Sequence, residues 1–316
     1  KKKEKRMIRG LSTLCLVLCC CLVGILGEVS GGFGSAGDPC RRHLLPGRGA
    51  GREMLVLIKG AGDLATGVAH RLYGVGVSVV MTELEAPTAV RRGVAFSQCI
   101  YDGVAEVEGV TARRAEGLQE VSEILGRGDV AVLADPTAAI RNKLPFAAVI
   151  DAVLAKRNTG TRITDAPVVI ALGPGFTAGK DCHGVVETQR GPELGRLLLA
   201  GSATPDTGIP GEVAGYSAQR VLRVPADGIF EPLAAIGDFV DVGEPVARVA
   251  GIPVRSGLSG MVRGLLPRGI PVKTGMKAGD VDPRREPELC RTISDKARRV
   301  AEGVLEGIRL LGKEET

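Results

Sequence analysis

The chain has 316 residues, of which 44% are hydrophobic and 24% charged. This composition is typical of a globular protein and excludes a disordered chain, which would be poor in Val, Ile and Leu. The 45 glycines follow no three-residue period, so a collagen triple helix is also excluded. A length of 316 residues predicts about two domains.

The net charge of +5 comes from the N-terminal stretch. Residues 1–53 hold ten Lys and Arg against four Asp and Glu, whereas the remaining 263 residues hold 31 against 32. Residues 54–316 therefore lack the excess of positive charge that is typical of a nucleic-acid-binding protein. The chain has no Trp and three Tyr, which also argues against a platform for stacking bases. We expect no nucleic-acid partner.

Residues 1–53 allow two interpretations. They resemble a secretory signal, because a basic start, KKKEKRMIR, precedes an apolar run and a Gly- and Ser-rich exit. Alternatively, Met54 is the true start and the preceding residues are read-through, because Met54 opens the pattern of a buried strand. We expect the second interpretation and therefore a cytoplasmic protein. We expect a membrane contact only if residues 1–53 are part of the native protein. The widely spaced Cys99, Cys182 and Cys290 also fit a reducing compartment.

A glycine-rich turn follows the first predicted strand, 55–59, and leads into an amphipathic helix. The order strand, glycine turn, helix is typical of nucleotide-binding proteins. Gly60 permits a tight turn, Gly62 lets the backbone approach a diphosphate, and the start of the helix supplies free N–H groups. Gly67 comes two positions late for the usual dinucleotide pattern, and Asp63 lies where a phosphate would bind. The alternative is that these glycines only permit close packing.

Three further predicted strands end in residues suited to a ligand site. Glu83 suits a pair of ribose hydroxyls, Asp135 follows the next strand, and Gly173 and Gly175 form a second glycine turn. These strands are expected over 77–82, 129–134 and 167–172. Ligands bind at the carboxyl ends of strands in open α/β sheets, so we expect these residues and the first glycine turn to face one crevice.

A polar cluster precedes the second glycine turn in the sequence. Lys156, Arg157 and Asn158 are donors suited to a phosphate-bearing ligand, although they also fit a surface loop.

Cys182, His183 and Glu187 are weak candidates for catalysis. In a helix, His183 and Glu187 share one face, and in a strand their even spacing also puts them on one face, so they suit an acid/base pair. Cys182 suits a thiolate nucleophile. The alternative is a solvated loop followed by a core segment, and we predict no metal site.

The second half of the chain contains an internal repeat. Residues 224–246 and 254–280 both read as short alternating strands with glycine turns, which predicts a small β barrel or sandwich. This pattern resembles the biotinyl/lipoyl hammerhead module. The joining hairpin, 250–253, has no lysine to carry a prosthetic group, so we expect a docking or packing module. Ser294 or Asp295 is expected to cap a helix that runs to about residue 311.

The predicted fold is α/β. A Rossmann-like domain with a mostly parallel sheet is followed by a small, hammerhead-like β barrel-sandwich and a C-terminal helix. The expected segments are an extension at 1–53, the Rossmann-like domain at 54–203, a linker at 204–216, the hammerhead-like domain at 217–283 and the helix at 284–316.

Several long motifs together resemble one family. They are GAGDLATGVAHRLY (60–73), TELEAPTAVRRGVAFSQCIYDG (82–103), AKRNTGTRITDAPVVIALGPGFTAGKDCHGVVETQRG (155–191) and PDTGIPGEVAGY (205–216). The chain is similar to the YqeB family of selenium-dependent molybdenum hydroxylase system proteins, which are distantly akin to XdhC-type maturation factors. The resemblance spans residues 54–311 and leaves 1–53 uncovered.

The resemblance implies a cytoplasmic accessory role in which a molybdenum cofactor is delivered, modified or inserted for a client hydroxylase. A pterin cofactor carries a phosphate, so the glycine turns suit it as well as they suit NAD(P). Two alternatives remain open, an NAD(P)-dependent oxidoreductase and an assembly scaffold without catalysis. The absence of a clear hydride-transfer set weighs against the oxidoreductase.

Overall fold

A computed structural model describes residues 54–313, all of which lie in one compact unit. The two interpretations of residues 1–53 concern a segment outside the described residues. Among residues 54–313, no helix has both the length and the apolar character needed to span a bilayer.

The first part of the chain forms a nine-stranded sheet in the order β3-β4-β5-β2-β1-β6-β7-β8-β9. The strands from β4 to β8 in this order run parallel, whereas β3 and β9 pair antiparallel at the two edges. Their bounds are β1 (Leu55–Lys59), β2 (Ser78–Glu83), β3 (Val104–Val107), β4 (Val110–Ala115), β5 (Val130–Ala134), β6 (Ala148–Asp151), β7 (Val168–Leu172), β8 (Gly184–Val186) and β9 (Leu197–Leu198).

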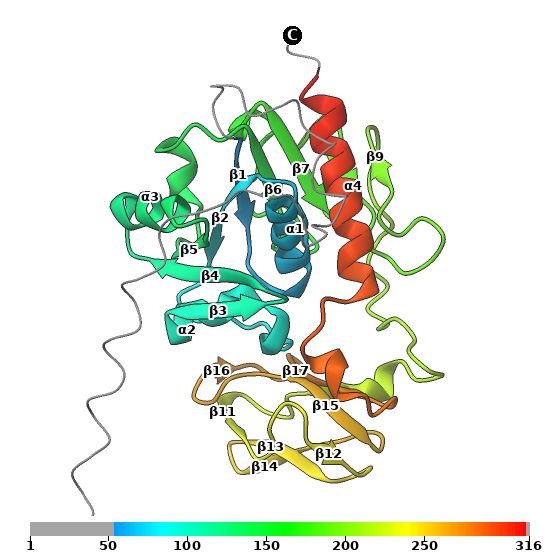
Figure 1. Cartoon of the computed structure of the whole chain (residues 1–316). Helices are drawn as coiled ribbons and strands as arrows, with labels where there is room; N and C mark the ends of the chain where they lie inside the picture. Colours follow the sequence, from blue (N-terminus) through cyan, green and yellow to red (C-terminus); the bar gives the residue numbers. More distant parts are fainter. Residues whose placement is uncertain (1–53, 314–316) are drawn as a thin grey trace, which may run out of the picture. The chain divides into compact units, whose positions relative to one another are not determined.

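Both faces of this sheet are covered (Figure 1). Val56 and Ile58 of β1 belong to the core that includes residues of α1 (Asp63–Gly74) and α4 (Asp295–Leu311), whereas Leu57 belongs to the core beside α3 (Leu118–Gly126). Burial on both sides explains why the central strands are continuous apolar runs, since alternating strands would expose one face to water. A short helix, α2 (Cys99–Asp102), precedes β3.

The C-terminal helix α4 completes one face of the sheet. Ser294 caps it, because its Oγ accepts a hydrogen bond from the Ala297 N–H at 3.1 Å. Gly67 of α1 lies against Ala297, and a Cβ at Gly67 would come within 2.8 Å of the Ala297 Cβ. The expected cap and the end of the helix at residue 311 are confirmed, and the helix packs into the first sheet.

The second part of the chain folds into two four-stranded antiparallel sheets, in the orders β10-β17-β15-β12 and β14-β13-β11-β16. Their apolar side chains form a separate core that includes Phe230, Val262 and Val281. We call residues 221–282 the β module. Its strands are β10 (Val221–Arg223), β11 (Gly228–Pro232), β12 (Phe239–Val240), β13 (Pro245–Val249), β14 (Ile252–Arg255), β15 (Gly260–Leu265), β16 (Pro271–Val272) and β17 (Lys277–Asp282).

The predicted fold, a Rossmann-like domain followed by a hammerhead-like β barrel-sandwich, is wrong, whereas the C-terminal helix is present as α4. The sheet is mixed, because hairpins place the antiparallel strands β3 and β9 at its edges. A Rossmann-like domain needs crossover helices between successive strands, but β5 to β7 are joined by loops with single 3₁₀ turns, at Ala139–Asn142 and Ile163–Asp165. The β module consists of two antiparallel sheets. The sequence indicates where strands occur and leaves their pairing open. The predicted division of the chain at 204–216 and 284 stays a prediction.

Candidate active site and ligand cavities

The residues predicted to contact a ligand follow neighbouring strands. Because β5, β2, β1, β6 and β7 are parallel and adjacent, their carboxyl ends lie at one edge of the sheet. The first glycine turn follows β1, Glu83 ends β2 and Asp135 follows β5. Lys156, Arg157 and Asn158 come after β6, and Gly173 and Gly175 come after β7.

The two glycines of the first turn have different roles. Gly60 has a φ of +92°, and a Cβ there would lie 2.9 Å from the Ala152 carbonyl oxygen, so this position needs glycine. Gly62 has a φ of −69°, and apart from its neighbours in the chain no residue has an atom within 4 Å of its Cβ position. Open space therefore lies beside Gly62, where α1 begins and the first N–H groups of the helix lack partners within it.

Glu83 holds the glycine turn in place. Its Oε2 accepts a hydrogen bond from the Ala61 N–H at 2.9 Å, and its Oε1 accepts one from the Leu84 N–H at 2.8 Å. Both carboxylate oxygens are therefore engaged by the backbone. The predicted contact with ribose hydroxyls would have to use the remaining lone pairs.

Asp63 has a cationic partner that the sequence did not reveal. The Oδ2 of Asp63 lies 3.4 Å from Nη1 of Arg91, whose side chain is 8% exposed. The positive charge of Arg91 offsets the negative charge of Asp63 beside the glycine turn. Asp63 is therefore a smaller obstacle to an anionic ligand than its place in the motif suggests.

The loop after β6 is strained and packs against the second glycine turn. Leu154 and Lys156 have φ values of +59° and +61°, which residues other than Gly rarely adopt. A Cβ at Gly175 would lie 2.6 Å from the backbone of Arg157, so the two loops touch. The Lys156 Nζ is 2.5 Å from the Asp206 carboxylate, which leaves this lysine paired at the surface.

Asp135 and Asn158 stabilise their own turns. The Asp135 Oδ2 accepts a hydrogen bond from the Ile140 N–H, and the Asn158 Oδ1 accepts from the backbone of Gly160 and Thr161. A Cβ at Gly173 would lie 2.5 Å from the Thr188 Oγ1. These contacts give each residue a structural role at the same edge of the sheet.

The three candidates for catalysis are engaged in different ways. Burial, followed by the nearby charge of Asp181, raises the pKa of the Cys182 thiol to about 12, so this sulfur is protonated at neutral pH. The His183 Nδ1 accepts a hydrogen bond from the Val169 N–H at 3.0 Å. The Glu187 carboxylate accepts hydrogen bonds from three backbone N–H groups, those of Thr188, Gln189 and Thr204. The structure gives Glu187 a role that its spacing from His183 did not indicate.

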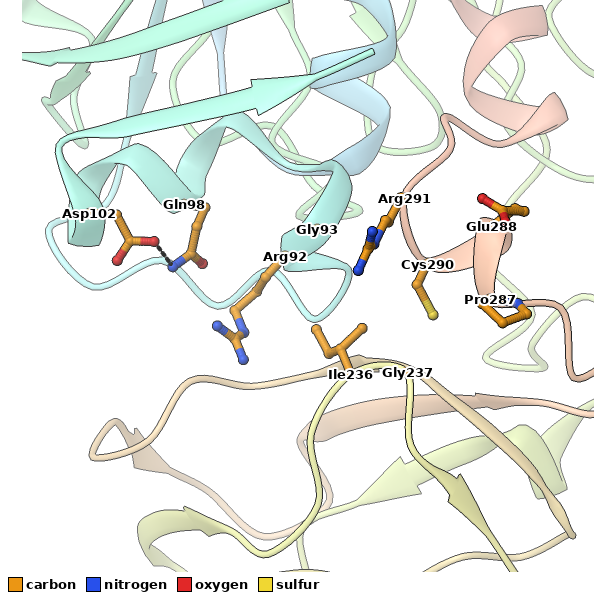
Figure 2. Close-up of a pocket in the computed structure, with 10 residues that line it drawn as sticks. All are labelled: Arg92, Gly93, Gln98, Asp102, Ile236, Gly237, Pro287, Glu288, Cys290 and Arg291. Atoms are coloured by element: carbon orange, nitrogen blue, oxygen red, sulfur yellow. Dashed lines mark hydrogen bonds between the residues drawn. The ribbon is translucent and has the colours of Figure 1, made fainter. Parts of the chain in front are cut away.

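The loop after β2 joins the sheet edge to the β module. The Leu265 N–H donates to the Val90 carbonyl at 2.8 Å, and the Arg92 Nε donates to the Leu265 carbonyl at 2.8 Å. A cavity of about 470 Å³ adjoins this contact and is shown in Figure 2. Its lining residues are Arg92, Gly93, Gln98, Asp102, Ile236, Gly237, Pro287, Glu288, Cys290 and Arg291.

A second cavity, of about 420 Å³, is lined by three arginines. Arg190 comes from the segment after β8, Arg263 from β15, and Arg284 from the segment after β17. These residues lie far apart in the sequence, and no spacing rule predicts that they meet. Within residues 54–313, no group of three or more His, Cys, Asp or Glu is arranged to hold a metal ion.

One curated relative matches most of the chain. Over 259 residues, or 82% of this chain, the sequence is 48% identical to a protein of Escherichia coli (strain K12) described as uncharacterized protein YqeB. This match supports the YqeB family label that the motifs predicted. The chain spans about half of that relative, since the match covers 48% of its length. No family model matches the chain.

Solved structures show weak similarity. An aspartoacylase family protein from Mesorhizobium loti is 15% identical, with a TM-score of 0.23, and a succinylglutamate desuccinylase/aspartoacylase from Rhodobacter sphaeroides is 16% identical, with a TM-score of 0.24. Each similarity covers 73% of this chain and 85% of the other. TM-scores this far below 0.5 do not establish a shared fold.

Proposed function

We propose that this chain is a cytoplasmic accessory factor for selenium-dependent molybdenum hydroxylases, which holds a phosphate-bearing pterin cofactor during its modification or insertion. The similarity to YqeB supports the family part of this proposal. The accessory role comes from the resemblance of the motifs, because the name of that relative states no activity.

The open space beside Gly62 is the observation that carries the proposal. A phosphate bound there would accept hydrogen bonds from the unpaired N–H groups at the start of α1, where the helix dipole favours an anion. Apart from Gly62 itself and its neighbours Ala61 and Asp63, no atom lies within 4 Å of the Gly62 Cβ position, so no other segment of residues 54–313 fills this space. The residues present therefore fit a phosphate group.

Two side chains would prepare this site. Glu83 fixes the Ala61 N–H through a hydrogen bond of 2.9 Å and so sets the path of the turn. Arg91 pairs with Asp63 and reduces the repulsion between that carboxylate and a bound phosphate. When bound, a molybdenum pterin would supply the redox metal that the client enzyme needs. The residues of this chain would bind and orient its phosphate.

The β module is the part that we propose contacts the client hydroxylase. Phe239 and Val242 are 51% and 66% exposed on it, and Ile229 and Leu233 are each 50% exposed. Large apolar side chains at the surface are a feature of protein contact sites when they form a patch.

The proposal is tested by native mass spectrometry of the protein purified from its own cells, with molybdenum and phosphorus analysis. We expect a pterin to co-purify, and we expect Gly62→Val to lower its occupancy about tenfold or more, because the added side chain fills the phosphate position. Gly117→Val is the matched control, since Gly117 is the N-cap of α3 and also has no atom within 4 Å of its Cβ position.

Other outcomes would favour the alternatives. A co-purified nicotinamide dinucleotide, with turnover of NADH, would favour an NAD(P)-dependent oxidoreductase. If no cofactor co-purifies and Gly62→Val still activates the client hydroxylase, the protein is an assembly scaffold.

A further inference from the structure

We propose that the arginine-lined cavity is a second anion site, which binds a small oxyanion of the diphosphate class. The cavity lies where the segment after β8, the segment before β10, the β module and the start of α4 come together. Its volume, about 420 Å³, is in the range of small-molecule sites.

The donor groups lining the cavity suit an anion. The lining carries the guanidinium groups of Arg190, Arg263 and Arg284. The carboxylates of Glu212, Asp295 and Asp282 balance their charge, because Glu212 and Asp295 also line the cavity and Asp282 pairs with Arg263 and Arg284. Guanidinium groups bind phosphate oxygens with two parallel hydrogen bonds, a geometry that single point charges cannot provide. A diphosphate offers enough oxygens to engage more than one of them.

Arg263 is held in an environment that is costly for a lone cation. Its side chain is 8% exposed, its Nε donates to the Leu289 carbonyl at 3.1 Å, and its Nη1 lies 3.5 Å from the Asp282 carboxylate. Burial, followed by the positive charge of Arg91, lowers the pKa of Arg263 to about 10, although Asp280 and Asp282 oppose this shift. A bound anion would offset both the burial of this cation and its repulsion from Arg91.

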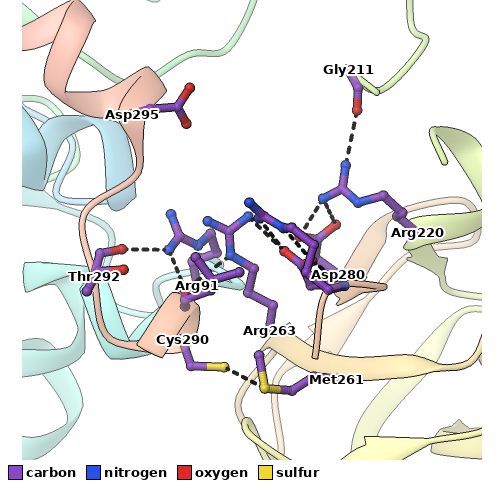
Figure 3. A network of polar contacts seen from close by, with 12 residues as sticks. Arg91, Gly211, Arg220, Met261, Arg263, Asp280, Cys290, Thr292 and Asp295 are labelled. Carbon is purple, nitrogen blue, oxygen red and sulfur yellow. Dashed lines mark hydrogen bonds and ion pairs between the residues drawn. The ribbon is translucent and has the colours of Figure 1, made fainter. Parts of the chain in front are cut away.

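Arg91 adds a second buried guanidinium beside Arg263 (Figure 3). Its Nη2 donates to the carbonyls of Leu289 and Thr292, at 3.1 and 3.0 Å, and its Nε is buried with no hydrogen-bond partner among the described residues. Leu289 and Thr292 also line the cavity. Because Arg91 contacts them and Asp63 as well, it connects this cavity to the glycine turn.

The carboxylates at the cavity leave donors available. Asp295 takes two hydrogen bonds from Arg190, and its side chain is 70% exposed. Asp282 accepts from the Nε and Nη2 of Arg284. A guanidinium has five N–H donors, so donors remain on each lining arginine. The start of α4, whose cap residue Ser294 lines the cavity, adds the favourable end of a helix dipole.

The test is a calorimetric titration of the purified full chain with inorganic pyrophosphate. We expect saturable binding that weakens as salt rises, and we expect Arg190→Gln and Arg284→Gln each to weaken it about tenfold or more. Arg223→Gln is the matched control, because Arg223 is exposed on β10 and donates to the Gly275 carbonyl away from the cavity. Circular dichroism and thermal unfolding confirm that each variant is folded.

Three results would overturn the inference. They are no binding of pyrophosphate to the wild-type chain, equal binding by the Arg190→Gln and Arg284→Gln variants, and an equal loss in Arg223→Gln. Gly62→Val separates the two proposals, because it should lose any binding of pyrophosphate at the glycine turn and keep the binding that Arg190→Gln and Arg284→Gln weaken. If Gly62→Val alone loses binding, the anion binds at the glycine turn.

Discussion

Glu187 is 4% exposed, and its carboxylate accepts hydrogen bonds from three backbone N–H groups. Burial alone would raise the pKa of this carboxyl. The hydrogen bonds from the backbone of Gln189, Thr204 and Thr188 outweigh burial, so the pKa is lowered. The ionised carboxylate therefore joins the end of β8 to the segment at Thr204 and stabilises the fold.

This arrangement predicts the effect of Glu187→Gln. At pH 7 we expect the free energy of unfolding to fall by about 1–3 kcal/mol, because the amide group of Gln places an N–H donor among backbone donors. Since the folded pKa lies below the unfolded value of about 4.3, the contribution of Glu187 is complete above that value. It is lost as the pH falls through the lowered folded pKa.

Urea unfolding of the wild-type chain and the variant at a series of pH values measures this difference. The difference in stability should be largest at neutral pH and shrink below about pH 4. Glu231→Gln, an exposed substitution on β11, is the control and should change little. An equal stability of wild type and Glu187→Gln at pH 7 would contradict the role assigned to this carboxylate.

At the scale of elements, α4 depends on small residues to approach the sheet. A Cβ at Gly303 would overlap the Gly195 carbonyl oxygen and come within 3.0 Å of the Val186 side chain. Gly195 has a φ of +84°, so the segment between β8 and β9 is itself restricted at this contact. The helix and the segment therefore pack without room for one methyl group.

This contact reverses the usual effect of replacing glycine in a helix. Gly→Ala within a helix normally stabilises by up to about 1 kcal/mol, but we expect Gly303→Ala to destabilise by about 1–3 kcal/mol through overpacking. Gly126→Ala in α3 is the control, because no atom from outside its own helix lies within 4 Å of its Cβ position, and it should be neutral or stabilising. Thermal unfolding measures the Tm of both variants against the wild-type chain. A higher Tm for Gly303→Ala would show that α4 is not packed so closely.

At the scale of the whole molecule, the β module contacts the sheet edge through β15. A Cβ at Gly264 would lie 2.8 Å from the Val90 carbonyl oxygen, which also accepts the Leu265 N–H. The contact brings the module against the loop that carries Arg91 and Arg92. Both cavities are lined by residues from this boundary.

We therefore predict that Gly264→Ala loosens the contact between the module and the loop after β2. Hydrogen exchange followed by mass spectrometry should show faster exchange at the Leu265 amide and in residues 88–94, because opening of this contact costs less free energy. The peptides of β1 and β7 should exchange as in the wild type. Unchanged exchange at Leu265 would mean that the loop adjusts to the added methyl group without losing the hydrogen bond.

Local features of the chain were visible in the sequence alone. The apolar run at 55–59 is β1, the run at 167–172 contains β7, and Ser294 caps the last helix, because these features depend on side chains close together in the chain. The glycine turn after β1 was also evident. The order of parallel strands then followed from the three-dimensional pairing, which brought the predicted site residues to one edge.

Only the tertiary structure decided how the strands pair and which side chains meet. The parallel pairing of β1 with β6 and the packing of α4 on α1 both join residues far apart in the chain. The arginine-lined cavity likewise combines Arg190, Arg263 and Arg284. Periodicity reports the environment of one segment, whereas burial and charge pairing depend on neighbours that arrive from other segments, so the sequence alone could not supply them.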